Sequence, residues 1–411
     1  MRNTSLKLAF KVMARRKVFT AISLVGISLT LVVLVVAAAI FDNTFGASAP
    51  ESRIGRMRVV RYVSMFGPQS TYGSNPGFGF LQRTIRNLPG AEMVSVYGES
   101  MTSIIYDQGR RIEAQLTKTD GAYWRILDFH FVEGGPFTAA DDDGDRHVVV
   151  LSQTLRDKVF GGGPAVGRTL NIGGSMFRVV GVVAPVAATR ITAWSEMWAP
   201  IGALSAEERA AFGGHFNGLV LARRDADVKA MRREFNARVA REPISDPKEY
   251  KEIRAGLDTQ FEAFARQLTS NRTSNPALFV AGILAVAALL FMSLPALNLI
   301  TLNLSRIMER SGEIGVRKAF GAPRRALVTQ FVAENIVLTL IGGVISIVLS
   351  LIALRVIESV APIADVHLTL NLRVFAYGIA IAFLFGVLSG VYPAWKMSRL
   401  HPVEALRGGS L

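Results

Sequence analysis

The chain contains no cysteine, and only 19% of its 411 residues are charged. The missing thiols exclude disulfides, a cysteine nucleophile and every cysteine-ligated zinc or iron–sulfur centre. An ordinary soluble domain carries about 25% charged residues. Half of the chain is hydrophobic and the mean hydropathy is +0.33. This composition excludes a disordered chain and disfavours a purely soluble enzyme.

Four long apolar runs account for the high hydropathy. A helix needs about 20 apolar residues to cross the hydrocarbon core of a bilayer. Runs of that length lie at 18–41, 277–302, 327–354 and 374–395, and Glu334 is the only charged residue between Arg325 and Arg355. We therefore predict an integral membrane α-helical protein with four transmembrane helices per subunit. The first run is longer than the apolar core of a signal peptide, so we expect an uncleaved anchor.

The net charge of +14 is mainly a signal of topology. Six Lys or Arg and no acid lie in 1–17, six against two acids in 303–326, and three against one acid in 396–411. Positive charge marks cytoplasmic segments, so both termini and the 303–326 loop are expected in the cytoplasm and the short 355–373 loop outside. Little net positive charge remains elsewhere, which argues against nucleic acid as a partner.

The segment 42–275 is long enough for a large α+β extracytoplasmic domain between helices 1 and 2. Strand and helix patterns predict a strand–helix–strand unit at about 50–120 and 216–245, split by a β-rich block at about 121–215. Within the block, strands at 169–172 and 177–183 are joined by a Gly173-Gly174 hairpin. A helix is expected at 225–241, with one apolar face formed by Val228, Met231, Phe235 and Val239.

An apolar stripe with helical spacing precedes the second predicted span. It predicts a stalk helix at about 248–275 that couples the outer domain to the membrane; an ordinary core helix is the alternative. The stripe consists of Tyr250, Ile253, Leu257, Phe261, Phe264 and Leu268.

Two motifs approximate ligand sites but lack required groups. The sequence at 162–169 resembles a phosphate-binding P-loop, yet Arg168 stands where the motif needs Lys and a strand, not a helix, follows. The acidic run at 141–145 lacks the twelfth-position Glu of a calcium loop. The five histidines form no HExxH pair. We therefore predict no catalytic residue, no metal site and no cofactor on this chain.

The 303–326 loop carries a different pattern. A short helix is expected to end at Gly321, and Glu313 and Arg317 are spaced to pair on it. Ile314, Val316 and Phe320 give this short element more apolar bulk than it can bury alone, so it needs a partner surface or the lipid interface.

Small residues recur every four positions along the fourth predicted span. They line one helix face, where small side chains let two helix backbones approach closely in lipid. We expect this face to pack against another span, within the subunit. The residues are Gly378, Ala382, Gly386 and Gly390.

Several stretches together resemble the FtsX/MacB-type ABC transporter permeases. They are the loop at 309–323, QFVAE at 330–334, and GVYPAW at 390–395 with RLHPVEALR at 399–407. The outer block from EGGPF at 133–137 to FRVVGVV at 177–183 resembles the family's MacB-like periplasmic core domain, and the spans resemble its FtsX-like transmembrane domain.

The resemblance implies a multi-pass permease in the bacterial inner membrane with a large periplasmic domain. Such a subunit forms a homo- or heterodimer with a second permease and works with an ABC ATPase, which binds and hydrolyses Mg-ATP. Only 17 residues precede the first predicted span, so we expect the ATPase on a separate chain. The chain itself would not be an enzyme. A periplasmic adaptor, an outer-membrane channel and membrane lipids are further expected partners.

The family pattern also implies a role for the cytoplasmic loop. It assigns ATPase coupling to Glu309, Glu313, Ile314, Val316, Arg317, Lys318, Phe320, Gly321 and Ala322. The implied function is mechanotransmission, in which ATP hydrolysis below the membrane moves the periplasmic domains for export of a peptide, drug or lipid-linked substrate. The alternatives are an FtsX-like regulator or sensor of the cell envelope, or a lipoprotein-releasing subunit, with no cargo passing through the membrane.

Overall fold

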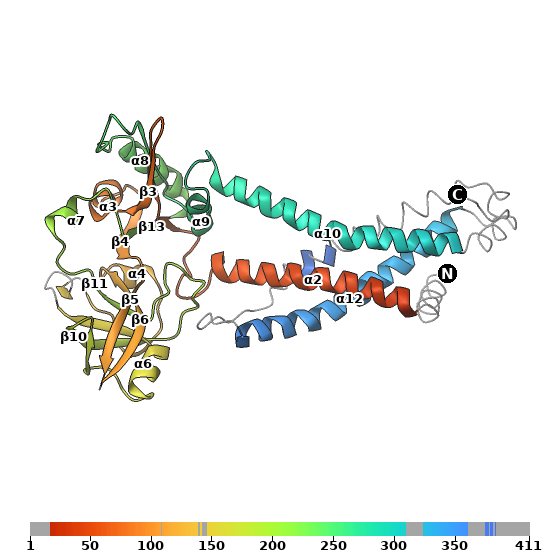
Figure 1. The fold of residues 1–411 in the computed structure, drawn as a ribbon, viewed down its shortest axis with the longest axis horizontal. Helices are drawn as coiled ribbons and strands as arrows, with labels where there is room; N and C mark the ends of the chain where they lie inside the picture. Colours follow the sequence, from red (N-terminus) through yellow and green to blue (C-terminus); the bar gives the residue numbers. More distant parts are fainter. Residues whose placement is uncertain are drawn as a thin grey trace. The chain divides into compact units, whose positions relative to one another are not determined.

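The computed structural model describes residues 17–107, 109–138, 140–141, 146–309, 324–360, 375–377, 379–380 and 383. The chain divides into two compact units (Figure 1). One unit contains Asn43–Gly282 and is called the folded domain below. The other is built from long helices, and each unit is described by itself.

Three long helices occupy the first three predicted spans. They are α2 (Lys17–Phe45), α10 (Pro276–Glu309) and α12 (Arg324–Val360). Thr20–Phe45 and Ile336–Ser359 are long and apolar enough to cross a membrane, whereas the apolar stretch Pro276–Phe291 is shorter. Ile27 and Leu31 of α2 are buried with Val337 and Leu338 of α12. The fourth predicted span lies almost wholly outside the described residues, so the number of four helices stays a prediction.

Part of a ten-stranded sheet in the folded domain is a group of three antiparallel strands, called the central sheet below. It consists of β1 (Met57–Val60), β13 (Phe216–Ala222) and β4 (Ala91–Gly98), with β13 in the middle. Successive side chains of a strand point to opposite faces. Leu219 and Leu221 accordingly join one apolar core, and Val220 and Ala222 join another that contains α3 (Phe78–Ile85) and α8 (Val228–Val239). The predicted apolar face of α8 is confirmed, since Val228, Met231, Phe235 and Val239 are all buried.

Six further strands close into a barrel. Their order is β6 (Arg110–Thr119), β11 (Met197–Pro200), β8 (Val148–Ser152), β10 (Ser175–Val183), β9 (Thr169–Ile172) and β5 (Met101–Asp107), and β5 pairs with both β9 and β6. The β9–β10 hairpin turns at Gly173 and Gly174, as predicted. Val149 and Leu151 of β8 point into the barrel core, while Val148 and Val150 point into the core shared with the central sheet.

The remaining strands and helices lie outside the central sheet and the barrel. The strand β7 (Phe131–Gly134) extends β10, and a small sheet has the order β12 (Gly213–Gly214), β3 (Thr71–Pro76), β2 (Val63–Phe66), β14 (Glu252–Ala255). Short helices are α4 (Tyr123–Ile126), α6 (Gln153–Phe160), α7 (Ala206–Ala210), the 3₁₀ turn η1 (Asp225–Asp227) and α9 (Gln260–Leu268).

Two predictions about the folded domain need correction. The inserted block was expected to begin at about 121, but β5 and β6 at 101–119 already belong to the barrel. The predicted stalk helix at 248–275 is wrong. The segment instead forms β14, which pairs with β2, and then the separate helix α9. Thr259 and Glu262 form a capping box that begins α9, which explains why a new helix starts inside the apolar stripe.

Candidate functional site: helix α9 and the two ends of the folded domain

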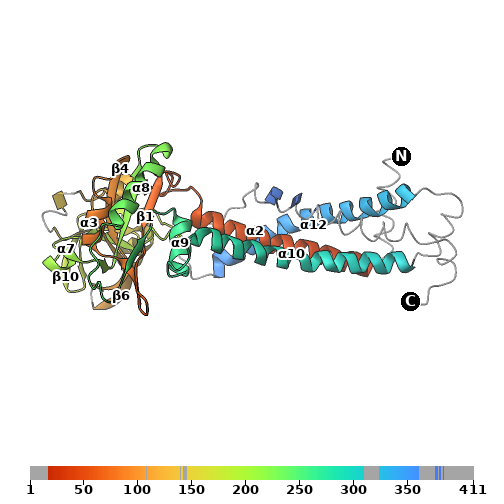
Figure 2. The same cartoon turned by 90° about the horizontal axis from the view of Figure 1, so that it is seen from above.

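The folded domain is joined to the rest of the chain through two segments. The entry segment, 43–53, follows the body of α2, and the exit segment, 256–275, contains α9 and leads into α10. Figure 2 shows α9 in the folded domain, and Phe45, the last residue of α2, belongs to the same unit. The ring of Phe45 packs on Phe261 and Phe264 of α9, with ring centroids 5.4 and 5.8 Å apart. Through α9, the exit segment therefore contacts the entry segment.

Arg190 holds the entry segment from the loop between β10 and β11. Its side chain is 3% exposed, and its guanidinium donates to the carbonyl of Gly46, the hydroxyl of Ser48 and the carboxylate of Glu51, the last at 3.3 Å. Glu51 is buried as well, and this burial raises the pKa of its carboxyl although the charges of Arg190 and Arg61 act to lower it. The buried Arg190 thus fixes the backbone that follows α2.

A second arginine holds the end of the entry segment. Arg53 donates to the carbonyl oxygens of Arg125 and Ile126 at the end of α4, at 2.6 and 2.9 Å. Arginines commonly bond to the last carbonyls of a helix in this way. Asn43, at the other end of the segment, accepts a hydrogen bond from the hydroxyl of Thr189. The entry segment is therefore bonded to the domain along its whole length.

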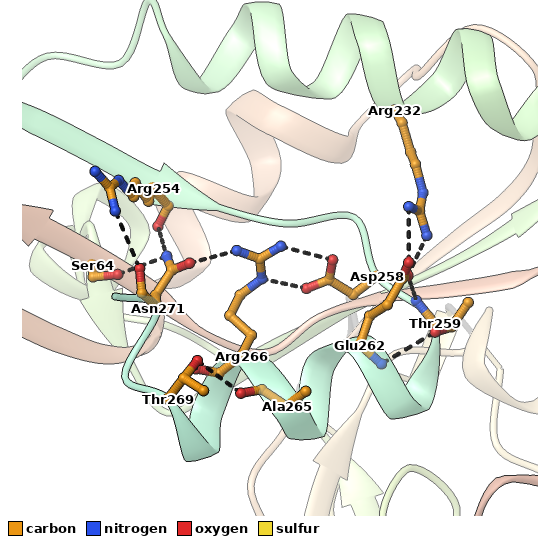
Figure 3. Close-up of polar contacts among 10 residues, drawn as sticks. All are labelled: Ser64, Arg232, Arg254, Asp258, Thr259, Glu262, Ala265, Arg266, Thr269 and Asn271. Carbon is orange, nitrogen blue, oxygen red and sulfur yellow. Dashed lines mark hydrogen bonds and ion pairs between the residues drawn. The ribbon is translucent and has the colours of Figure 1, made fainter. Parts of the chain in front are cut away.

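The exit segment is closed by a network around Arg266 (Figure 3). The guanidinium of Arg266 binds both carboxylate oxygens of the buried Asp258, at 2.6 and 3.0 Å, and donates to Oδ1 of Asn271. The amide of Asn271 donates in turn to Ser64 of β2 at 2.8 Å and to the carbonyl of Arg254 in β14 at 3.0 Å. Burial raises the pKa of Asp258, and Arg266 opposes that shift. This network ties the turn after α9 to the small sheet.

A second ion pair ties the start of α9 to α8. Nη1 and Nη2 of Arg232 donate to the carboxylate of Glu262, which also accepts from the backbone N–H of Thr259 at 2.7 Å (Figure 3). Burial acts to raise the pKa of Glu262, but these bonds outweigh it and the pKa lies below its usual value. The two ends of α9 are thus fixed by separate ion pairs.

The P-loop-like motif is a structural turn. Gly161 ends α6 in the left-handed conformation. The carboxylate of Glu133 accepts the backbone N–H of Ala165 at 2.9 Å, and this bond lowers the pKa of Glu133. Arg168 stacks on the ring of Phe160. A backbone donor that would face a phosphate is therefore already bonded to a side chain of the domain.

The other predicted site residues cannot be placed. Glu309 is the last residue of α10, and the rest of the coupling set, 313–322, lies outside the described residues. The small-residue face, Gly378, Ala382, Gly386 and Gly390, lies outside them too. Both assignments stay predictions. Within the part of the chain that the structure describes, no three His, Asp or Glu side chains gather as metal ligands.

Comparisons with known proteins identify the family. The model of the MacB-like periplasmic core domain matches residues 20–238, and the model of the FtsX-like permease C-terminal domain matches residues 285–402. The chain therefore belongs to the FtsX/MacB-type ABC transporter permeases. Permeases of this family lie in the inner membrane with a periplasmic domain, and membership implies a partner ATPase. The folded domain lies mostly within the match to the periplasmic core domain.

Named relatives include permeases and exporters. The uncharacterized ABC transporter permease YknZ of Bacillus subtilis is 26% identical over 80% of this chain and 79% of its own length. The pyoverdine export ATP-binding/permease protein PvdT of Pseudomonas entomophila is 30% identical over 68% of this chain. The macrolide export ATP-binding/permease protein MacB of Chromobacterium violaceum is 28% identical over 69% of it. The matches span only 41% and 42% of those two longer relatives.

Two solved structures align with about half of this chain. A domain of a putative permease from Porphyromonas gingivalis aligns with 50% of this chain and 90% of its own, at 16% identity and a TM-score of 0.40. The periplasmic region of MacB from Actinobacillus actinomycetemcomitans aligns with 53% of this chain and 94% of its own, at 14% identity and a TM-score of 0.35.

Proposed function

We propose that this chain couples ATP hydrolysis by a separate cytoplasmic ATPase to motion of its folded domain, in an export system that works by mechanotransmission. The observation that carries the proposal is the position of α9, which contacts the entry segment through Phe45 and holds the exit segment through Arg266. A displacement of either α2 or α10 would then move the folded domain as one body.

The anchoring contacts suit a mechanical role. The aromatic contact of Phe45 is apolar, whereas the exit network consists of charged hydrogen bonds to a buried carboxylate. Charge-assisted bonds of this kind are directional and roughly twice as strong as neutral ones. A segment held by both kinds of contact resists bending better than a flexible linker would, so little of an imposed movement would be lost at the domain boundary.

The ATPase, the cytoplasmic loop and a second permease also have roles in the proposed function. The ATPase would hold Mg-ATP and dock on the 303–326 loop, with Glu313, Arg317 and Lys318 as polar contacts and Ile314, Val316 and Phe320 as apolar ones. Both chain termini would then be cytoplasmic, and a second permease copy would complete the dimer. The names of the pyoverdine and macrolide relatives favour export of a peptide or drug-like molecule, with a periplasmic adaptor and an outer-membrane channel as further partners.

The absence of cysteine allows a direct test. A single Met176→Cys substitution places one reactive thiol on an exposed site of the barrel, where Met176 is 55% exposed. We would spin-label this site in the full complex in nanodiscs, so that each of the two permease copies carries one label. Pulsed electron resonance then measures the distance between the two labels with and without ATP. The proposal expects an ATP-dependent shift of this distance.

Loss of the α9 contact should abolish the shift. In a Phe261→Ala, Phe264→Ala background, ATP turnover should persist while the distance no longer responds to ATP. Phe160→Ala, which removes a ring far from the entry and exit segments in sequence, is the matched control and should behave like wild type. An unchanged shift in the double variant would contradict the role of α9, and no shift in wild type would contradict mechanotransmission.

A further inference from the structure

An open pocket of about 430 Å³, lined by both polar and apolar groups, lies in the folded domain and is called the cavity below. Its size is within the range of about 300–1,000 Å³ that is typical of small-molecule sites. The exposed residues Glu99 and Ile191 stand at its mouth. Its walls come from the four strands β3, β4, β6 and β13, from three loops and from α9, and include Arg61, Asn75, Thr117, Trp194, Asn217 and Gln267.

Arg61 is the unusual residue in this wall. It is only 7% exposed, yet its hydrogen-bond partners among the described residues are neutral: Nε donates to the hydroxyl of Tyr97 at 3.3 Å and Nη2 donates to the hydroxyl of Thr192. Among the described residues no carboxylate oxygen comes within ion-pair distance of this guanidinium, and its Nη1 forms no hydrogen bond. The positive charge of Arg61 is therefore buried without a direct counterion.

The neighbouring Arg190 shows the contrast. Arg190 is buried to a similar degree and pairs with Glu51 at 3.3 Å. Glu51 also acts on Arg61 through space, so one carboxylate serves two guanidinium groups. A buried charge that lacks a partner costs several kcal/mol. The excess positive charge in this region would be compensated if an anion occupied the cavity beside Arg61.

Neutral groups of the wall restrict the kind of anion. Asn217 is 5% exposed and accepts a hydrogen bond from Asn75 at 3.3 Å, and no described residue accepts from its own amide nitrogen. At the mouth, Glu99 accepts from Asn75 at 2.6 Å and lies 3.7 Å from a ring nitrogen of His215. The negative charge of Glu99 disfavours ligands with several negative charges. The half-buried ring of Trp194 offers an apolar wall.

We propose that this cavity binds a small organic molecule with one carboxylate, an amide or similar hydrogen-bonding group, and an apolar or aromatic part. The carboxylate would bind Nη1 of Arg61, and the amide nitrogen of Asn217 would donate to the hydrogen-bonding group. The apolar part would lie against Trp194. The site shares Gln267 of α9, but Phe45, Phe261, Phe264 and Arg266 do not line it, and it does not depend on coupling to an ATPase.

Binding can be measured with a matched pair of probes. We would titrate the full-length chain in nanodiscs with N-acetyl-L-phenylalanine, with its uncharged carboxamide, and with citrate as a polyanion, using calorimetry and saturation-transfer NMR. A hydrogen bond to a charged group gains about 1.5–3 kcal/mol, so the carboxamide should bind at least about tenfold more weakly than the acid. Citrate should also bind more weakly than the acid.

Two variants locate the site. Ala188→Phe would fill the cavity from the loop without removing a bond of Arg61, and it should abolish binding of the acid. Ala203→Phe adds the same ring at an exposed position that does not line the cavity, and it should bind like wild type. Arg61→Met should lose the preference for acid over carboxamide, with the melting temperature as a check of folding.

Three results would overturn the proposal. The first is equal affinity for the acid and the carboxamide, or tighter binding of citrate. The second is wild-type binding in Ala188→Phe. The third is the absence of saturable binding of N-acetyl-L-phenylalanine at concentrations well above about 1 mM, which corresponds to roughly 4 kcal/mol of binding free energy.

Discussion

Arginine side chains hold the ends of the folded domain, and their partners differ in kind. Arg266 is paired with one buried carboxylate through two nitrogens, whereas Arg190 divides its bonds between a carbonyl, a hydroxyl and Glu51. Removal of an arginine from a buried pair leaves an uncompensated charge. The loss of folding free energy in each arginine variant should therefore show how much that end of the domain depends on its ion pair.

Arg266→Met should destabilise the folded domain by about 3 kcal/mol, because Asp258 would keep a buried charge without its partner. Adding Asp258→Asn should restore part of the lost stability, since the second substitution removes the negative charge of Asp258. The melting temperatures of the purified chain and of the two variants, followed by tryptophan fluorescence, measure both effects. A double variant less stable than Arg266→Met would contradict the explanation.

The Arg232–Glu262 pair predicts a dependence on pH. The pKa of Glu262 is below the usual 4.5 in the folded state, because the bonds from Arg232 and Thr259 outweigh the effect of burial. A carboxyl with a lowered pKa stabilises the fold above its unfolded pKa and loses that contribution as the pH falls through the folded value. Glu262→Gln should thus melt below wild type at pH 7, and the difference should shrink below about pH 4.5.

A surface acid provides the comparison for this pH series. Among the described residues Glu113 pairs with Arg111, and both side chains are more than 60% exposed. Such pairs contribute little to stability. Glu113→Gln should therefore have the wild-type melting temperature at every pH of the series. A difference in melting temperature between wild type and Glu262→Gln that stays constant with pH would contradict the role of Glu262.

At the scale of elements, the segment from β14 to α9 shows where the sequence pattern misleads. Ile253 and Leu257 have helical spacing with Phe261 and Phe264, but the first two pack against the core of α3 and α8 and the last two against Phe45. The two pairs therefore face different partners. The motif Thr259-x-x-Glu262 was a local signal of the new helix start, and it could have corrected the prediction.

Gly256 separates the two elements and should not tolerate a side chain. A Cβ atom there would lie 2.3 Å from Nη2 of Arg266 and 2.4 Å from the carboxylate of Asp258, so Gly256→Ala should disturb that pair and cost about 2 kcal/mol. Gly135→Ala is the matched control, because nothing lies within 4 Å of its added Cβ. Equal melting temperatures for the two alanine variants would show that the pair can move aside.

Local signals predicted some elements well. The strand at 169–172 has the bounds expected from the sequence, because the Gly173-Gly174 turn that ends it has a backbone preference of its own. The buried face of α8 followed from spacing alone. Neither the Arg190–Glu51 pair nor the β5–β9 pairing could be predicted, since their partners lie far apart in the chain and leave no local pattern.

At the scale of the whole molecule, the proposed function depends on the cytoplasmic loop. Glu313→Lys or Phe320→Asp should uncouple the permease from its ATPase without unfolding it, because both residues lie outside the folded domain and the predicted spans. Co-purification of the ATPase with each variant and its ATP turnover in lipid test this. Wild-type levels of both would contradict the coupling assignment, and Glu113→Lys in the folded domain is the control for the charge change.

The position of β13 in the central sheet has a consequence for synthesis. β13 lies between β1 and β4, yet every strand of the barrel precedes it in the chain. Chains are made from the N-terminus and domains generally fold as units, so the barrel can close before β13 has been translated. Until then β1 and β4 lack their shared neighbour, and unpaired strand edges invite wrong pairing. The nascent protein is therefore most exposed to aggregation during the short interval between the completion of the barrel and the arrival of one seven-residue strand.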